Sequence, residues 1–224
     1  MGSSVTEDPI STGKPALTSP PDNLQAFPSV NLFENRIVAR SHKVTYHPWW
    51  FASSPTEGGG RFDLADPRGT CYVADTIDAA VRERLREKIL TRQPISTRLA
   101  DSFAVSLFAM PRSFRCAHIG LRRAALFGVT RELESLPPRY YPLSREWAEA
   151  FAQADFEGIR YGVRFTPGRP NAWALFERAG GEVLPKPSVN LVIDGRDACR
   201  RSGIVVQDIP RSTALKNDTR ASLR

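Results

Sequence analysis

Short apolar segments, separated by glycine, proline and aspartate turns, make up most of the chain between about residues 27 and 206. Segments of this length that are rich in β-branched and aromatic residues are typical of strands. Strands are predicted at 36–40, 69–74, 103–110, 114–119, 158–165, 172–176, 189–193 and 204–206. Helices are predicted at 75–91 and from residue 143 or 144 to about 154. This pattern favours a single α+β domain, with a mainly antiparallel or mixed sheet flanked by a few helices.

The predicted helix 75–91, which Asp75 can cap, has one apolar face. That face consists of Ile77, Val81, Leu85 and Ile89, which recur every four residues. At about 100° per residue, Glu83 points almost directly away from it. Glu83 is therefore either a solvated side chain among arginines or a carboxylate that faces a cleft. In a cleft it could bind a ribose hydroxyl and stabilise positive charge at the anomeric carbon.

Two arginines and one tyrosine are candidates for binding a ligand. Arg61 follows three glycines, and its planar guanidinium can hold a phosphate through two parallel hydrogen bonds. Arg40, at the end of a predicted strand, is either a second residue that binds phosphate or a charged residue at the edge of the sheet without a ligand. Tyr72 lies in the middle of a strand, where it is either a core residue or a platform on which a ring can stack.

The net charge of +7 and the pI near 9.7 attract anionic partners of any class. Arg112, Arg115, Arg122 and Arg123 form a loose basic cluster. Direct nucleic-acid binding is not expected from it, because the aromatic residues that stack on bases are scarce around these cations. The three cysteines lack the close spacing of a zinc site, so reduced thiols and no metal are expected.

The ends of the chain differ in composition from the middle. Residues 1–26 are rich in Ser, Thr, Pro and Gly, so a disordered tail is expected there. Residues 207–224 are expected to form a loose basic tail, which leaves 27–206 as the domain. No segment approaches the ~18 apolar residues of a membrane span, and the N-terminus lacks a secretory pattern. A cytoplasmic protein without membrane contact is expected.

Five elements in order resemble the RES-domain family, whose members are bacterial toxins of toxin–antitoxin pairs that destroy NAD. These elements are Arg40, Gly59-Gly60-Arg61-Phe62, Cys71-Tyr72-Val73-Ala74, Glu83 and the segment 158–164 with the preceding Trp147-Ala148. The resemblance covers most of residues 33–206.

The resemblance implies a fold like that of ADP-ribosyltransferases, with NAD as the substrate in a cleft beside the sheet and no metal. The catalytic residues would be Glu83, Arg61 and Arg40, with Glu83 supporting the oxocarbenium-like ribose and the arginines holding the pyrophosphate. Tyr72 would contact the nicotinamide end, and Gly60, Tyr161 and Arg164 would also bind NAD. The reaction would break the nicotinamide–ribose bond, with phosphate or water as acceptor, and a cognate antitoxin protein would block the cleft.

One position departs from the family. The serine expected between Tyr161 and Arg164 is replaced, and Val163 aligns with it. A valine can neither donate to a phosphate nor position a nucleophile. Two alternatives to an NAD-degrading toxin therefore stay open: an ADP-ribosyltransferase that modifies a macromolecule, and a catalytically degenerate binding protein with the RES fold.

Overall fold

The computed structural model describes residues 15–53, 59–90, 93–168 and 170–208. The elements, where η marks a 3₁₀ helix, are β1 (Ser29–Leu32), β2 (Ile37–Lys43), β3 (Arg68–Ala74), α1 (Ile77–Leu85), η1 (Arg86–Ile89), β4 (Ile95–Ser96), α2 (Thr97–Ala100), β5 (Phe103–Ala109), β6 (Phe114–His118), η2 (Arg122–Phe127), α3 (Glu132–Ser135), η3 (Pro138–Tyr140), α4 (Tyr141–Gln153), β7 (Gly158–Gly162), β8 (Asn171–Arg178), β9 (Val189–Asp194), α5 (Gly195–Arg201) and β10 (Val206–Gln207).

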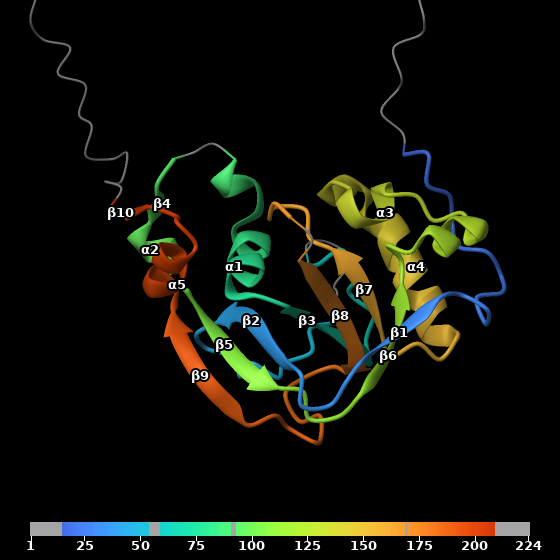
Figure 1. Cartoon of the computed structure of the whole chain (residues 1–224), viewed down its shortest axis with the longest axis horizontal. Coiled ribbons are helices and arrows are strands. Elements are labelled where there is room, and N and C mark those ends of the chain that lie inside the picture. Colours follow the sequence, from blue (N-terminus) through green and yellow to red (C-terminus); the bar gives the residue numbers. More distant parts are fainter. Residues whose placement is uncertain (1–14, 54–58, 91–92, 169, 209–224) are drawn as a thin grey trace, which may run out of the picture.

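Eight strands form one sheet in the order β1-β6-β7-β8-β3-β2-β5-β9. Only β6 and β7 run parallel, and the other neighbours in this sheet are antiparallel. The sheet is strongly curved, with α1 over its middle and α4 beside β7 (Figure 1). The predicted fold class, a single α+β domain with a mixed sheet and a few helices, is confirmed.

Side chains alternate between two apolar clusters on the two faces of the sheet. Cys71 and Val73 of β3 pack with Trp49 and Phe51 in the smaller cluster. Ala74 of β3 belongs to the larger cluster, which includes helices α1 and α4. The face that carries Ala74 is therefore the one that the helices cover.

Helix α1 begins two residues later than predicted and ends earlier. Thr76 is its N-cap and accepts a hydrogen bond from the backbone N–H of Ala79. Asp75, the predicted cap, instead accepts a hydrogen bond from the indole of Trp173. The α-helix ends where Arg86 adopts a φ of 52°, and the tighter η1 follows. The Arg86 side chain lines the cleft described below.

The expected disorder of residues 1–26 is wrong for the part that the structure describes. Leu17 and Leu24 are buried in the larger cluster. The backbone of this segment also bonds to the helical layer: Leu17 N–H donates to Glu132, and the Trp147 indole donates to the carbonyl of Thr18. The polar composition predicted disorder, but the two buried leucines are enough to anchor this segment on the core. Residues 1–14, and 209–224 of the expected basic tail, lie outside the described residues, and none of the described helices is long and apolar enough to cross a membrane.

Candidate functional site

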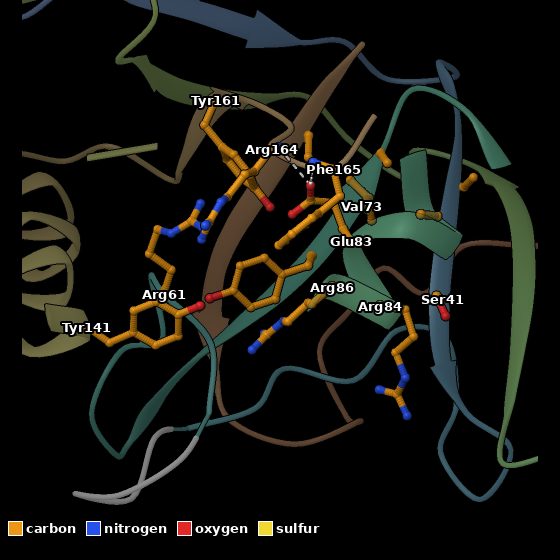
Figure 2. A pocket seen from close by; sticks show the side chains of 15 residues that line it. Ser41, Arg61, Val73, Glu83, Arg84, Arg86, Tyr141, Tyr161, Arg164 and Phe165 are labelled. Carbon is orange, nitrogen blue, oxygen red and sulfur yellow. Dashed lines mark hydrogen bonds between the residues drawn. The ribbon is translucent and has the colours of Figure 1, made fainter. Parts of the chain in front are cut away.

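A cleft lies between α1, the helical face of β2 and β3, the loop that joins β7 to β8, and the start of α4. It contains about 820 Å³ of space, part of it open to solvent, which is within the usual range for small-molecule sites. Its lining residues are Ala39, Ser41, Arg61, Tyr72, Val73, Ala74, Ala80, Glu83, Arg84, Arg86, Tyr141, Tyr161, Arg164, Phe165 and Ala172 (Figure 2).

The Glu83 carboxylate is held in place by the β7–β8 loop. Its Oε1 accepts hydrogen bonds from the backbone N–H of Arg164 at 2.8 Å and of Phe165 at 3.0 Å. Figure 2 shows both bonds and the carboxylate inside the cleft. Within the described parts of the chain, Oε2 receives no hydrogen bond. Glu83 therefore has one oxygen that fixes its orientation and one that is free for a ligand.

Arg61 is held at the cleft by a network beneath it. Gly60 N–H donates to Asp63 Oδ2 at 2.6 Å, and the Tyr72 hydroxyl donates to Asp63 Oδ1 at 2.7 Å. The same hydroxyl accepts from Phe62 N–H at 2.9 Å. A Cβ on Gly60 would lie 2.4 Å from the Tyr72 hydroxyl, so this position requires glycine. The loop is thus closed onto β3, and the Arg61 side chain points into the cleft.

The Arg61 guanidinium is buried and has an open hydrogen-bonding position. The residue is 7% exposed, and its Nε has no hydrogen-bond partner. Among the described residues it makes no ion pair, and its Cζ lies 5.8 Å from the ring centroids of both Phe62 and Tyr141. A buried cation without a carboxylate partner is costly, which is typical of a group that binds an anionic ligand.

Tyr161 connects the two ends of this site. Burial raises the pKa of Tyr161, the negative charge of Glu83 raises it further, and the charge of Arg61 opposes both. Tyr161 therefore lies close enough to feel both groups, and its phenol stays protonated as a hydrogen-bond donor. Figure 2 shows its ring between Arg61 and the Glu83 carboxylate.

Arg40 is one of two predicted site residues that do not line this cleft. The five that do are Arg61, Tyr72, Glu83, Tyr161 and Arg164. Arg40 lies on the opposite face of β2, where its guanidinium donates to the carbonyls of Pro48 and Trp50, each at 2.6 Å, and to Cys71 Sγ. The geometry makes Arg40 a brace for the segment that carries Trp49 rather than a clamp on a ligand. Gly60 also does not line the cleft, and it acts through Tyr72 and Asp63.

The comparison with protein-family models identifies the family of this chain. The model of the RES domain matches residues 34–194. The chain belongs to the RES-domain family. A chain in the crystal structure of the M. tuberculosis MbcT–MbcA toxin–antitoxin complex has a similar fold, with a TM-score of 0.57 at 8% identity. The match covers 76% of this chain and 91% of that one. No match was found among curated proteins.

Val163, the residue that the sequence resemblance aligns with the family serine, has no hydroxyl. Val163 is partly buried, packs against the larger apolar cluster and does not line the cleft. The cleft nevertheless contains a hydroxyl that sequence reasoning missed: Ser41 Oγ is buried and has no hydrogen-bond partner. Period-2 alternation was the available signal, because Ser41 shares a face of β2 with Ala39, whereas Arg40 has the other face.

Other cleft residues that the sequence did not identify are Arg84, Arg86, Tyr141 and Phe165. Burial lowers the pKa of Arg84, and the charge of Arg86 lowers it further. With Arg61 and Arg164 the cleft has four arginines against Glu83. It is therefore built for a strongly anionic ligand. In the described part of the chain, no group of three or more side chains could hold a metal ion.

Proposed function

We propose that this protein is an NAD-degrading toxin, which cleaves the bond between nicotinamide and ribose with phosphate or water as acceptor. The observation that carries the proposal is one oriented carboxylate facing a buried, unpaired guanidinium across a single cleft. Glu83 supplies the negative charge and Arg61 supplies the phosphate clamp. NAD needs both groups. Its anionic pyrophosphate binds a cation, and the positive charge that develops on its ribose is stabilised by a carboxylate.

The residues have distinct roles in this reaction. Arg61 and Arg164 bind the pyrophosphate. Glu83 Oε2 binds a ribose hydroxyl and stabilises the oxocarbenium-like charge that develops as the bond to nicotinamide breaks. Tyr161 donates a hydrogen bond from its hydroxyl to the substrate, and the ring of Tyr72 forms the wall at the nicotinamide end. The electron pair of the broken bond goes to the nicotinamide nitrogen, so the leaving group needs no proton. An oxygen of phosphate or water forms the new bond to the anomeric carbon, and when water is the acceptor it releases one proton to solvent.

A protein antitoxin is proposed as the macromolecular partner. The similar chain was crystallised in a toxin–antitoxin complex, and the basic charge of this protein favours an acidic partner. Such a partner would block access of NAD to the cleft in the cytoplasm.

The test is the loss of NAD over time with purified protein, with and without inorganic phosphate, for wild type, Arg61→Ala and Glu83→Gln. Glu83→Gln is the matched variant, because an amide oxygen can still accept both backbone hydrogen bonds. We expect each variant to lose about 100-fold or more in rate. The stimulation by phosphate, and the appearance of ADP-ribose 1″-phosphate in place of ADP-ribose, would identify the acceptor.

Two results would reject the proposal in favour of the alternatives. Transfer of label from NAD to protein or nucleic acid would identify a macromolecular ADP-ribosyltransferase. Binding of NAD by folded protein without any turnover would identify a degenerate binding protein, which the valine at position 163 favours.

A further inference from the structure

Arg86 has a backbone conformation that is unusual for a residue with a side chain. Its φ of 52° and ψ of −131° lie in a region that glycine adopts freely and that other residues avoid because of their Cβ. The position caps the C-terminal end of α1, and glycine is the common choice where a helix ends at a positive φ. Strain of this kind is typical of functional sites. The Arg86 side chain is therefore expected to have a use that offsets the strain.

No contact within the described chain explains why an arginine stands at this strained position. The Arg86 side chain is partly buried and lines the cleft. Among the described residues its guanidinium makes no hydrogen bond, ion pair or cation–π contact, although Glu83 is only three residues away and lines the same cleft. The guanidinium is thus available to a ligand.

Arg86 lies toward the end of the cleft that contains Arg61. Figure 2 shows the Arg86 side chain directed toward Arg61, whereas the Arg84 side chain is directed away from it. The electrostatics agree with this placement. Burial raises the pKa of Tyr161, the charge of Glu83 raises it further, and the charges of Arg61 and Arg86 oppose both effects. Two guanidiniums therefore lie close to one phenol, on the side of the cleft where the pyrophosphate is proposed to bind.

We propose that Arg86 binds the pyrophosphate of the dinucleotide together with Arg61. This inference rests on the proposed function and adds a binding residue to it. Two guanidiniums match the two negative charges of a pyrophosphate, and each can form parallel hydrogen bonds to its oxygens. Arg86 thus takes the role predicted for Arg40, which lies on the other face of β2.

The strain at Arg86 gives the proposal a test in which stability and binding change in opposite directions. Arg86→Gly removes the strain and the guanidinium together, so its thermal unfolding midpoint should rise by about 2–4 °C. Arg86→Ala keeps a Cβ at this position, so its midpoint should stay near that of wild type. A structural role for Arg86 predicts instead a lower midpoint in both variants.

Binding is measured by calorimetry with ADP-ribose and inorganic pyrophosphate, which lack the nicotinamide–ribose bond and cannot be cleaved there. Both variants should bind each probe about tenfold or more weakly than wild type, as expected for the loss of charge-assisted hydrogen bonds. Arg86→Lys keeps the charge but not the parallel hydrogen bonds, so its affinities should lie between those of wild type and Arg86→Ala. Inorganic phosphate is the third probe.

Arg123→Ala and Asn35→Gly are the matched controls. Arg123 is exposed on η2, outside the cleft, so its variant removes the same charge. Asn35 is exposed and has a φ of 63°, so its variant places glycine at another positive φ without a change of charge. Both controls should bind the probes as wild type does.

Wild-type affinity of Arg86→Ala for ADP-ribose and pyrophosphate would overturn the proposal, and so would a lower midpoint in Arg86→Gly. If inorganic phosphate alone bound in an Arg86-dependent way, the assignment to the pyrophosphate would be wrong. The proposed function fails separately, if NAD is not consumed by protein whose binding of ADP-ribose depends on Arg86. Cleavage of NAD by Arg86→Ala with the KM of wild type would instead reject the role of Arg86 and leave the proposed function intact.

Discussion

The Tyr72 hydroxyl donates a 2.7 Å hydrogen bond to Asp63 Oδ1, and this contact joins strand β3 to the loop that carries Arg61. Burial and the neighbouring Asp63 charge raise the pKa of Tyr72 well above its usual range. The phenol therefore stays protonated, and a hydrogen-bond donor, at neutral pH. Tyr72, predicted as a core residue or a stacking platform, thus also positions the loop that carries Arg61.

Tyr72→Phe should lower the free energy of unfolding by about 1–3 kcal/mol, because Asp63 Oδ1 and Phe62 N–H lose a buried partner. Denaturant unfolding measures this change. Tyr46→Phe is the control, since Tyr46 is exposed and its ring stacks on Trp50. Equal midpoints for Tyr72→Phe and wild type would mean that the network does not hold the loop.

Substitutions of Glu83 should separate the effect of its hydrogen bonds to the loop from the effect of its negative charge. Glu83→Gln keeps an oxygen that accepts from Arg164 and Phe165 N–H, whereas Glu83→Ala removes it. Hydrogen exchange of these two amides should therefore stay near wild type in the glutamine variant and become about tenfold faster in the alanine variant. Equally fast exchange in both variants would show that the carboxylate charge, and not the hydrogen bonds, secures the loop.

Arg61→Met should raise stability while abolishing NAD cleavage. The buried guanidinium has no carboxylate partner, so an apolar side chain of similar length should add about 1 kcal/mol or more to the free energy of unfolding. Inorganic pyrophosphate should raise the unfolding temperature of wild type but not of this variant. A loss of stability in Arg61→Met would instead make Arg61 a structural residue.

Acid should destabilise the protein through His118. Burial lowers the pKa of His118 to about 4, and the adjacent Arg160 contributes. The unfolded chain, in which a histidine titrates near its ordinary value of about 6.5, therefore binds the proton more readily than the native state. Stability should be full above pH 6.5 and should fall as the pH is lowered from about 6.5 to about 4.

The measurement is a series of denaturation curves across this range for wild type and His118→Gln. The variant should show a shallower decline, with the remaining slope due in part to His42, whose pKa burial also lowers. Parallel curves for the two proteins would assign the acid sensitivity elsewhere.

The sequence by itself determined which residues share a side of each element. The four-residue repeat in helix 75–91 set Glu83 opposite Val81 and Leu85, and these two are buried in the structure while Glu83 is not. Alternation along 69–74 separated Tyr72 from Cys71 and Val73, as found. These relations follow from the helix and strand periods alone, which local backbone geometry fixes.

Only the tertiary structure decided which face of the sheet meets the cleft. Arg40 and Ser41 are adjacent, and no local pattern says which of them lies under α1. The answer depends on how the helices pack across strands that are distant in sequence. In the structure Ser41 lines the cleft, whereas Arg40 braces the segment around Trp49 from the other face. The burial of Leu17 is of the same kind, because its backbone N–H donates to Glu132, 115 residues along the chain.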